Sequence, residues 1–453
     1  MICNGQQDRV SILTNTNWKK RICVFLMFVA FILLGYMLTY PSPFEYHRRF
    51  GMNNAVSVLR KRNRLLYDVT VEPNVYVHGT PNSGMCFLRN KLERKNFPVI
   101  HSVFSDPVSK NVVFIAVRLF EDEYDKDPYA CAFQNGYRTL SDPVVHDYKS
   151  FGYIVQYMMI ITCPIPEKLY NLPNITVDLI RVTDDTMWFL YAIENLTVCP
   201  SGIPIYRYHN LAMCTLVKHL DSSISDWIEY HVYQGVDQIL LYDNILQNES
   251  NLIETVQKYI DRGYVTVIPW SHEPSNFKTH LEVQIAHEND CIWRLKHSTQ
   301  WVIKIDVDEF LQPMGDNRVK VNEILVNFDT TKIAALHVQN WFFGRPINDR
   351  KVLPDGNIFE RNTWRSHWPT ALNTGRDKSI IHPLNVHYFK IHGVKIGADS
   401  ISLNPFKEMR LVHYRMENNR TRDIDLPPWE VQDLSMVNLW QEVQKWKLRE
   451  RVF

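Results

Sequence analysis

From about residue 205 onward the chain alternates strand-like and helix-like segments, and this alternation constrains the fold more than any other feature of the sequence. The strand-like segments are short and apolar, and they cover residues 211–220, 239–244, 264–270, 301–310 and 332–343. The helix-like segments have apolar side chains at helical spacing, and they cover residues 225–235, 251–263 and 279–297. Strands that alternate with helices predict an α/β fold with a parallel sheet, whose ligands bind at the carboxyl ends of the strands.

The preceding part of the chain, residues 69–204, has a different pattern. Its apolar runs are short, rich in β-branched and aromatic residues, and bounded by Pro, Asn, Asp and Gly, as in NVVFIAVRLF and GYIVQYMMIITC. This pattern predicts a β-rich domain built as an antiparallel sheet or sandwich. Charged residues make up 22% of the whole chain and hydrophobic ones 45%, which is typical of a folded protein. The net charge of +1 provides no global field for nucleic acid, so we expect no nucleic-acid partner.

An uncharged apolar run from Ile22 to Tyr40 is long enough to cross a bilayer, because 19 helical residues span about 30 Å. It lacks the small-residue cleavage site of a signal peptide, so we expect an uncleaved membrane anchor. The expected organisation is a cytosolic tail (1–21), a transmembrane helix (22–40), a stem (41–68), the β-rich domain (69–204), a catalytic domain (205–427) and a C-terminal segment (428–453).

Glycosylation acceptors and cysteines both indicate on which side of the membrane the main part of the chain lies. The N-x-Ser/Thr sequons all follow the apolar run, at Asn174, Asn195, Asn248 and Asn419. Six of the eight cysteines follow it as well, at positions 86, 131, 163, 199, 214 and 291, with no CxxC pair that would suggest zinc. We therefore expect a large domain in an oxidising, lumenal compartment. Fifteen pairings of the six cysteines remain open.

The sharpest candidate for a functional site is the acidic sequence Asp306-Val307-Asp308-Glu309, where an apolar strand ends in three carboxylates. Carboxylates next to a buried strand are tolerable when a cation offsets their charge, and Mg²⁺ or Mn²⁺ there could bridge the oxygens of a diphosphate. Two other D-x-D sequences, at 125–127 and 423–425, lie in polar surroundings and are predicted to be solvated loops.

Polar residues end a second buried strand at Asp243 and Asn244. A turn or helix cap would explain them, but carboxylates at two strand ends of one α/β sheet face the same crevice. One could then bind a nucleoside and the other a metal-bound diphosphate. The helix before the acidic sequence also has polar residues among its apolar positions, Gln284, Asn289 and Asp290, which suggests that they are bonded inward.

Several of these segments together resemble glycosyltransferase family 92, over residues 206–415. The matching sequences are DWIEYHVYQGVDQILLYDN, Gln284 through Cys291, WVIKIDVDEFLQP, GNIFER, DKSIIHP, KIHG and LVHYR. The resemblance implies a type II membrane protein of the secretory pathway, expected in the Golgi, with a GT-A type nucleotide-sugar-binding fold. It also implies inverting transfer of galactose from UDP-galactose to a glycan acceptor on a glycoprotein or glycolipid. One segment departs from the family pattern, since LVKHLDSSI replaces a loop that usually contains Lys-Asn-Glu.

The resemblance also implies roles for individual residues. Asp308 would bind a divalent metal, expected to be manganese, and Asp306 would bind the ribose or the metal. Asp243, with Asn244, would face the uridine, and Lys378 would meet the diphosphate. The metal would stabilise the UDP leaving group as it gains negative charge.

An inverting mechanism needs one carboxylate base, and the candidates are Glu309, Asp355 and Glu360. A further metal ligand could be His392 in KIHG or His413 in LVHYR, because neutral imidazole suits Mn²⁺ better than Mg²⁺. Of the two, His392 is preferred, since Gly393 beside it would let the backbone pass close to the nucleotide.

Two alternatives to this assignment stay open. Phosphatases also place D-x-D at a strand end, but they need a small hydroxyl or β-branched residue where this chain has Phe310, and they place the motif near the N-terminus. A catalytically inactive, membrane-anchored glycan-binding paralogue would share the sequence marks without the activity.

Overall fold

The computed structural model describes a set of segments that lie between residues 75 and 450. They are residues 75–76, 86–87, 98–117, 129–147, 158–172, 174–182, 189–200, 209–218, 223–245, 251–270, 280–315, 319–345, 356–372, 375–414 and 429–450. All described residues belong to one compact unit, Val71–Phe453. The expected tail, transmembrane helix and stem lie outside the described residues. Within the described segments, no helix is long and apolar enough to cross a membrane.

The β-rich domain is a sandwich of two sheets, as the sequence predicted. One sheet has the order β11-β3-β4-β8-β7, with strands Cys199–Pro200, Val99–Asp106, Asn111–Val117, Met158–Pro164 and Val145–Asp147. The other has the order β10-β9-β5-β6, with strands Phe189–Thr197, Thr176–Val182, Tyr129–Phe133 and Arg138–Leu140. Neighbouring strands are antiparallel except for β11 and β3. Apolar residues of both sheets form one buried cluster, and the Cys131–Cys163 disulfide joins β5 to β8 across it. A short separate pair, β1 (Val75–Tyr76) and β2 (Cys86–Phe87), precedes the sandwich.

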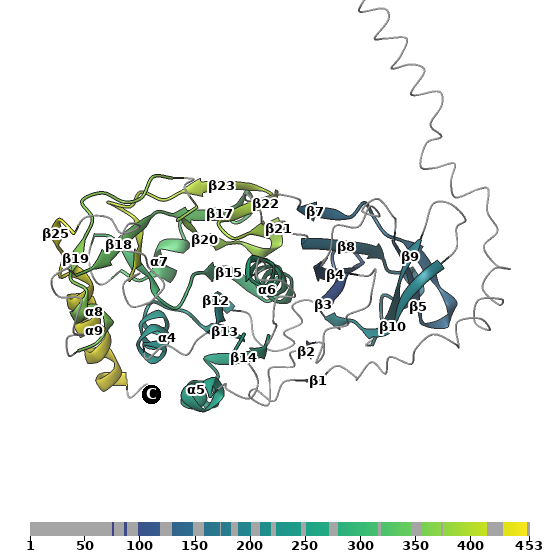
Figure 1. Ribbon diagram of the computed structural model, residues 1–453, viewed down its shortest axis with the longest axis horizontal. Coiled ribbons are helices and arrows are strands. Elements are labelled where there is room, and N and C mark those ends of the chain that lie inside the picture. Colours follow the sequence, from purple (N-terminus) through teal and green to yellow (C-terminus); the bar gives the residue numbers. More distant parts are fainter. Residues whose placement is uncertain are drawn as a thin grey trace, which may run out of the picture. The chain divides into compact units, whose positions relative to one another are not determined.

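The α/β part is built on a seven-stranded sheet with the order β14-β13-β12-β15-β20-β17-β23 (Figure 1). The strands are Val265–Pro269, Gln238–Asp243, His209–Val217, Thr299–Lys304, Lys378–Ile381, Ile333–Val338 and Asp399–Ser402. The first four are parallel to one another, as expected. Strand β20 runs antiparallel to both β15 and β17, so the sheet is mixed rather than wholly parallel.

The helices between these strands match the sequence prediction closely. They are α4 (Ile224–Tyr233), α5 (Leu252–Asp261) and α6 (His280–Leu295). The glycines expected to end the first two helices, Gly235 and Gly263, have φ values of 94° and 77°, which glycine adopts without strain. Asn251 stands at the N-terminus of α5 as predicted, but its side chain makes no capping hydrogen bond.

Two apolar segments, each predicted from the sequence to be a single strand, each form two strands, and the two strands belong to different sheets. Residues 301–310 divide into β15 and β16 (Glu309–Pro313), and residues 332–343 divide into β17 and β18 (Asn340–Gly344). The second strand of each pair joins a five-stranded sheet with the order β16-β24-β18-β19-β25, completed by Met409–His413, Trp364–Arg365 and Val431–Gln432. The break between β15 and β16 falls at Asp306–Asp308, where carboxylates follow the apolar residues of the buried strand.

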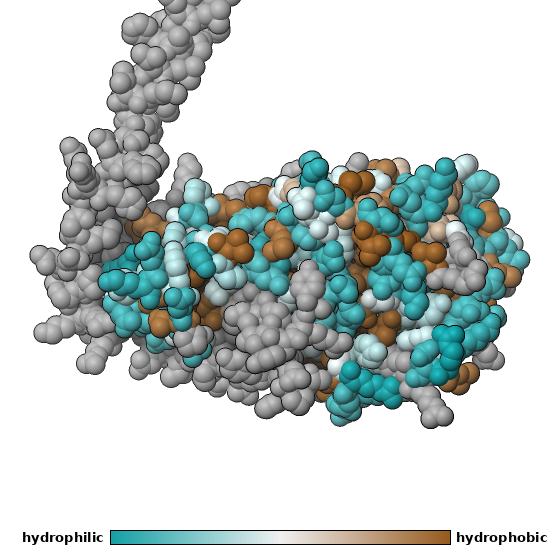
Figure 2. Space-filling view, turned by 180° about the vertical axis from the view of Figure 1, so that it is seen from behind, coloured by the Kyte–Doolittle hydropathy of each residue, from teal (hydrophilic) through white to brown (hydrophobic). Residues whose placement is uncertain are grey.

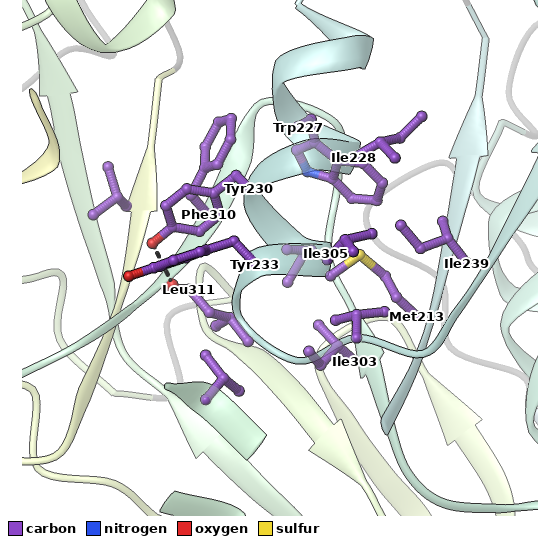
Figure 3. Close-up of a cluster of buried hydrophobic side chains, with 14 of the residues drawn as sticks. Met213, Trp227, Ile228, Tyr230, Tyr233, Ile239, Ile303, Ile305, Phe310 and Leu311 are labelled. Carbon is purple, nitrogen blue, oxygen red and sulfur yellow. Dashed lines mark hydrogen bonds between the residues drawn. The ribbon is translucent and has the colours of Figure 1, made fainter. Parts of the chain in front are cut away.

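Helix α4 packs directly against β16, the strand that follows the acidic turn formed by Asp306–Asp308 (Figure 3). The Tyr230 hydroxyl donates to the carbonyl of Leu311 at 2.8 Å, and the Trp227 indole N–H donates to the carbonyl of Glu309 at 2.9 Å. Phe310 is fully buried between these contacts, with its ring 5.2 Å from that of Tyr230. These contacts fix the backbone immediately after Asp308.

The C-terminal helix α9 (Ser435–Glu450) belongs to the same core as this part of the sheet. Its buried side chains are Met436, Leu439, Trp440 and Val443, and they lie in one hydrophobic cluster with residues of α4, β16 and β24. Short helices α7 (Val321–Leu325) and α8 (Ile358–Arg361) and the hairpin of β21 (Val386–Lys390) and β22 (Gly393–Gly397) complete the α/β part. The C-terminal segment, expected as a separate unit from residue 428, therefore packs as part of the α/β core.

Helix α6 also contacts the β-rich sandwich. Phe104 and Val113 of the sandwich share a buried cluster with Ile285 and Trp293 of α6. The His297 imidazole, just after the helix, lies 2.8 Å from a carboxylate oxygen of Asp106. On the face seen in Figure 2, hydrophobic side chains occur singly or in small groups among hydrophilic ones, as is usual for a protein surface.

Candidate active site

The acidic turn between β15 and β16 forms the centre of the candidate site. It lies at the carboxyl end of β15, where the sequence placed it, with the fully buried Ile305 and Phe310 on either side. The Asp306 side chain is 41% exposed, whereas the Asp308 side chain is buried, with 8% exposed. The two carboxylates are therefore held at a ligand-binding edge by a rigid apolar frame.

Lys378 and Glu309 anchor the first of these carboxylates. The Lys378 ammonium, from the antiparallel strand β20, donates to Asp306 Oδ2 at 2.7 Å and lies 3.3 Å from Glu309 Oε2. The same Glu309 oxygen accepts the backbone N–H of Asp306 at 2.9 Å. Lys378, predicted to meet a diphosphate, is thus bonded to two carboxylates and is 6% exposed.

His413 lies beside the second carboxylate. It is the cross-strand partner of Glu309 in the pairing of β24 with β16. Its Nε2 is 3.5 Å from Asp308 Oδ2, and its Nδ1 is 3.4 Å from Glu309 Oε1. The structure therefore brings together five of the residues predicted from the sequence, namely Asp306, Asp308, Glu309, Lys378 and His413.

Two further charged residues, which the sequence analysis did not select, extend this cluster into the protein. The Lys304 ammonium is 4.0 Å from Asp306 Oδ1 and 3.8 Å from Glu288 Oε1, and both residues are almost fully buried. A signal for Lys304 existed in the sequence, because a lysine within the buried strand WVIKI requires a carboxylate partner. No comparable signal marked Glu288 among the polar residues of α6.

The cluster contains more acidic than basic groups. It consists of four carboxyl groups, two ammonium groups and one imidazole, which belong to Glu288, Asp306, Asp308, Glu309, Lys304, Lys378 and His413. Its formal charge is minus two when all four carboxyl groups are ionised and the imidazole is neutral, and burial raises the pKa of Glu288 to about 7. A divalent cation at the exposed end of the cluster would balance this charge.

Burial and neighbouring charges shift the pKa values of these groups in different directions. Burial would raise the pKa of the Asp306 carboxyl, but the Lys378 and Lys304 ammonium groups outweigh it and hold that pKa well below its usual range. Burial raises the pKa of Glu309, against the opposing charge of Lys378. Burial would lower the pKa of His413, but the Asp308 carboxylate raises it above the ordinary value. Asp306 is therefore ionised throughout the physiological range.

His392, the preferred metal ligand from the sequence, lies close enough to Lys378 and Asp306 for their charges to act on its imidazole. Burial, with the charge of Lys378, lowers the pKa of its imidazole to about 4, so the ring is neutral at pH 7. Its Nδ1 is 2.8 Å from the carbonyl oxygen of Asp377. A Cβ at Gly393 would meet the His337 ring at 3.2 Å, so the space beside this glycine is occupied by the protein itself.

Asp243 and Asn244 end β13, two strands away from β15 in the same sheet. Asp243 Oδ1 accepts the backbone N–H of Ile245 at 3.0 Å, and the Asn244 amide donates to the carbonyl of Trp270 at 2.9 Å. Both therefore shape the turn after β13, and the proposed contact with uridine stays a prediction.

The inward-facing polar residues of α6 are structural. The Asn289 side chain donates to the Phe389 carbonyl and accepts the Phe389 N–H, at 2.8 and 3.0 Å. Asp290 accepts the hydroxyl of Tyr242 at 2.5 Å and makes two hydrogen bonds with Arg294, each of 2.9 Å. These contacts attach α6 to β21 and to the end of β13.

Of the expected catalytic bases, Glu309 lies in the charged cluster and Glu360 lies at the start of α8. Glu309 belongs to the cluster but is 2% exposed and is held by Lys378 and His413. Glu360 is part of a capping box at the start of α8, where it exchanges hydrogen bonds with Asn357, and it lines a cavity of about 570 Å³ with residues of α4 and α9. Asp355 lies outside the described residues.

Comparison with known proteins finds relatives that are named as glycosyltransferases. A family 92 protein of Oryza sativa subsp. japonica is 29% identical over 46% of this chain and 36% of its own length. One from Ricinus communis is 26% identical over 44% of this chain and 35% of its own length. A beta-1,4-galactosyltransferase of Caenorhabditis elegans is 22% identical over 52% of this chain and 56% of its own length. All three are named as glycosyltransferases, and the match spans about a third to a half of their lengths.

The chain belongs to glycosyltransferase family 92, whose family model matches residues 209–449, more than half of the sequence. The matched range includes α9, in agreement with the packing of this helix in the core. A crystal structure of S. aureus TarS 1-349 matches 45% of this chain and 60% of that chain, with 12% identity and a TM-score of 0.28, which does not establish a shared fold.

Proposed function

We propose that this protein is a metal-dependent, inverting glycosyltransferase of GT-A type that transfers galactose from UDP-galactose to a glycan acceptor. The observation that supports it most is the acidic turn of a family 92 member, placed at a strand's carboxyl end within a negatively charged cluster. The name of the nematode relative supports galactose as the donor sugar.

Asp308 and His413 are the residues best placed to hold the metal, expected to be Mn²⁺. His413 Nε2 lies 3.5 Å from Asp308 Oδ2, and a carboxylate with an imidazole suits Mn²⁺. No group of three or more His, Cys, Asp or Glu side chains in the described segments has metal-binding geometry, so the remaining ligands would come from the diphosphate and water. The metal would supply positive charge to the diphosphate leaving group.

The residues of the chain would perform the rest of the reaction by positioning and proton transfer. The acceptor hydroxyl oxygen forms a bond to C1 of the sugar while the bond from C1 to the phosphate oxygen breaks, and UDP leaves with the bonding electron pair. A carboxylate takes the hydroxyl proton. Since Glu309 is buried and held by its neighbours and Glu360 caps α8, neither side chain is free to face an acceptor without rearrangement; Asp355 stays a prediction.

The purified protein should transfer galactose from UDP-galactose in the presence of Mn²⁺ when it is tested with a panel of nucleotide sugars on a glycan array. Hydrolysis of UDP-galactose without an acceptor provides a second readout. Removal of the metal with EDTA should abolish both. A protein that neither transfers nor hydrolyses any donor, yet binds glycans on the array, would be an inactive glycan-binding paralogue.

We also propose that the protein is a type II membrane protein of the Golgi with its catalytic domain in the lumen. Two disulfides, Cys131–Cys163 and Cys214–Cys291, suit an oxidising compartment. Cys199 is also disulfide-bonded. The sequons at Asn174 and Asn195 are both exposed and accessible to glycosylation.

Protein expressed in animal cells should therefore carry N-glycans at Asn174, Asn195 or both. Endoglycosidase treatment should increase its gel mobility, and the double variant N174Q/N195Q should show a smaller shift. Unchanged mobility, together with free alkylation of the downstream cysteines without reductant, would exclude the lumenal orientation.

A further inference from the structure

The hairpin of β21 and β22 turns beside the candidate site in an unusual conformation. Lys390 pairs with Gly393, so the turn consists of only two residues, Ile391 and His392. Turns of this kind favour Asn and Gly, because they require positive φ angles. Ile391 has a φ of 48°, which a β-branched residue rarely adopts. Such strain persists where the surrounding structure holds it, and it is often found at functional sites.

Glu288 on α6 holds this strained residue. Its Oε2 accepts the Ile391 N–H at 2.8 Å. The adjacent Asn289 holds Phe389 through both the N–H and the carbonyl of that residue. Three hydrogen bonds from two consecutive residues of one helix therefore fix the strand end and the turn that carries His392.

The other oxygen of the same carboxylate faces the acidic turn through Lys304. Glu288 Oε1 is 3.8 Å from the Lys304 ammonium, which is 4.0 Å from Asp306 Oδ1. Side-chain exposure is 0% for Glu288 and 3% for Lys304, and within the described residues neither of the two facing atoms makes a hydrogen bond. A buried ion pair with this geometry adds little to stability, because the cost of desolvation offsets the attraction. Its placement of Asp306 is the better explanation.

The Asp377 carbonyl fixes the tautomer of His392. Nδ1 lies 2.8 Å from the Asp377 carbonyl, which only accepts hydrogen bonds, so in the neutral ring Nδ1 carries the proton. Nε2 then has a free lone pair for a metal ion or a donor hydroxyl. Asp377 directly precedes Lys378, so the strand that holds Asp306 also orients this imidazole.

We propose that Glu288 is a positioning residue for sugar transfer, which holds the strained turn of His392 with one oxygen and the Lys304–Asp306 pair with the other. This inference rests on the proposed function and adds to it a residue that touches neither substrate nor metal. Glu288 then acts together with the Lys378 and Glu309 contacts of Asp306 and the Asp377 contact of His392.

A double-mutant cycle between Glu288 and Ile391 tests the proposal. E288L removes the acceptor of the Ile391 N–H, and we expect it to raise the KM for UDP-galactose at least tenfold. I391G removes the strain, so the turn should form without Glu288. The double variant E288L/I391G should therefore have a KM for UDP-galactose at least threefold lower than that of E288L. E288Q keeps an oxygen that can accept the Ile391 N–H but loses the charge that faces Lys304. It replaces E288L in the test if E288L does not fold.

Glu229 provides a matched control. It is also a buried glutamate, and it pairs with Lys258 of α5 and Lys447 of α9, neither of which belongs to the charged cluster of the site. E229L should lower Tm but keep the wild-type KM for the donor. A merely structural role for Glu288 would instead make E288L and E229L alike in Tm and in KM.

Hydrogen–deuterium exchange separates this inference from the proposed function, because it requires no activity. We expect E288L to increase exchange at the Ile391 amide at least tenfold, with E229L unchanged at that amide. If the Ile391 amide of E288L exchanges as slowly as that of the wild type, the inference is wrong, even if the enzyme is active. Equal donor KM values for E288L and wild type would overturn it too, whereas a wild-type protein without transfer or hydrolysis would contradict only the proposed function.

Discussion

Replacing Asp308 by Asn should reduce galactosyl transfer about a thousandfold or more, while the fold stays intact. The substitution keeps the shape of the side chain and removes the charge that a divalent cation needs. The backbone carbonyl of Asp308, which accepts the Tyr414 N–H at 2.9 Å, is unaffected. Without metal, D308N should have a Tm close to that of wild type, because the lost charge repels Glu309 but attracts His413. Steady-state kinetics and thermal unfolding in EDTA measure the two effects.

Asp399 is the matched control for this prediction, since it is an exposed aspartate on β23 of the same sheet. D399N should retain wild-type activity and the wild-type dependence on Mn²⁺. Similar losses in D308N and D399N would remove the metal from the acidic turn.

Removing the Cys214–Cys291 disulfide should lower the free energy of unfolding by about 4 kcal/mol. The bridge joins β12 to α6 and closes a loop with a sequence separation of 77, and the constraint that a disulfide places on the unfolded chain grows with loop length. The variant C214A/C291A avoids free thiols, and chemical denaturation measures the change.

The second bridge, Cys131–Cys163, provides the comparison within the same protein. Its sequence separation is 32, so C131A/C163A should lose about 0.8 kcal/mol less than C214A/C291A. It also lies within the β-rich sandwich, so its removal should affect activity less than removal of the bridge that fixes α6. Wild-type stability in C214A/C291A would contradict this account of the bridge.

Local patterns in the sequence were sufficient to predict the elements that form from neighbouring residues. Helices α4 and α5, their terminal glycines and the acidic turn at the end of β15 all follow from periodicity, turn chemistry and the position of charge. The β-rich sandwich was predicted in the same way, from short runs of β-branched residues.

Contacts between distant parts of the chain could not be predicted in this way. Lys378 meets Asp306 across 72 residues because β20 enters the sheet antiparallel, and no periodicity encodes that direction. His413 meets Glu309 through the register of β24 with β16, and Glu288 meets Ile391 across 103 residues. The resemblance to a family assigned roles to Lys378 and His413. Its matching segments also contain Lys304 and Glu288, but it assigned no role to either, because their contacts depend on tertiary packing.

The most direct test of the account is the binding of UDP to the wild-type protein and to D308N, measured by isothermal titration calorimetry with Mn²⁺ and again with EDTA. We predict that Mn²⁺ tightens UDP binding to the wild type at least tenfold and leaves binding to D308N unchanged. Equal UDP affinity of the wild type with and without Mn²⁺ would contradict a metal-dependent nucleotide-sugar site at Asp306–Asp308.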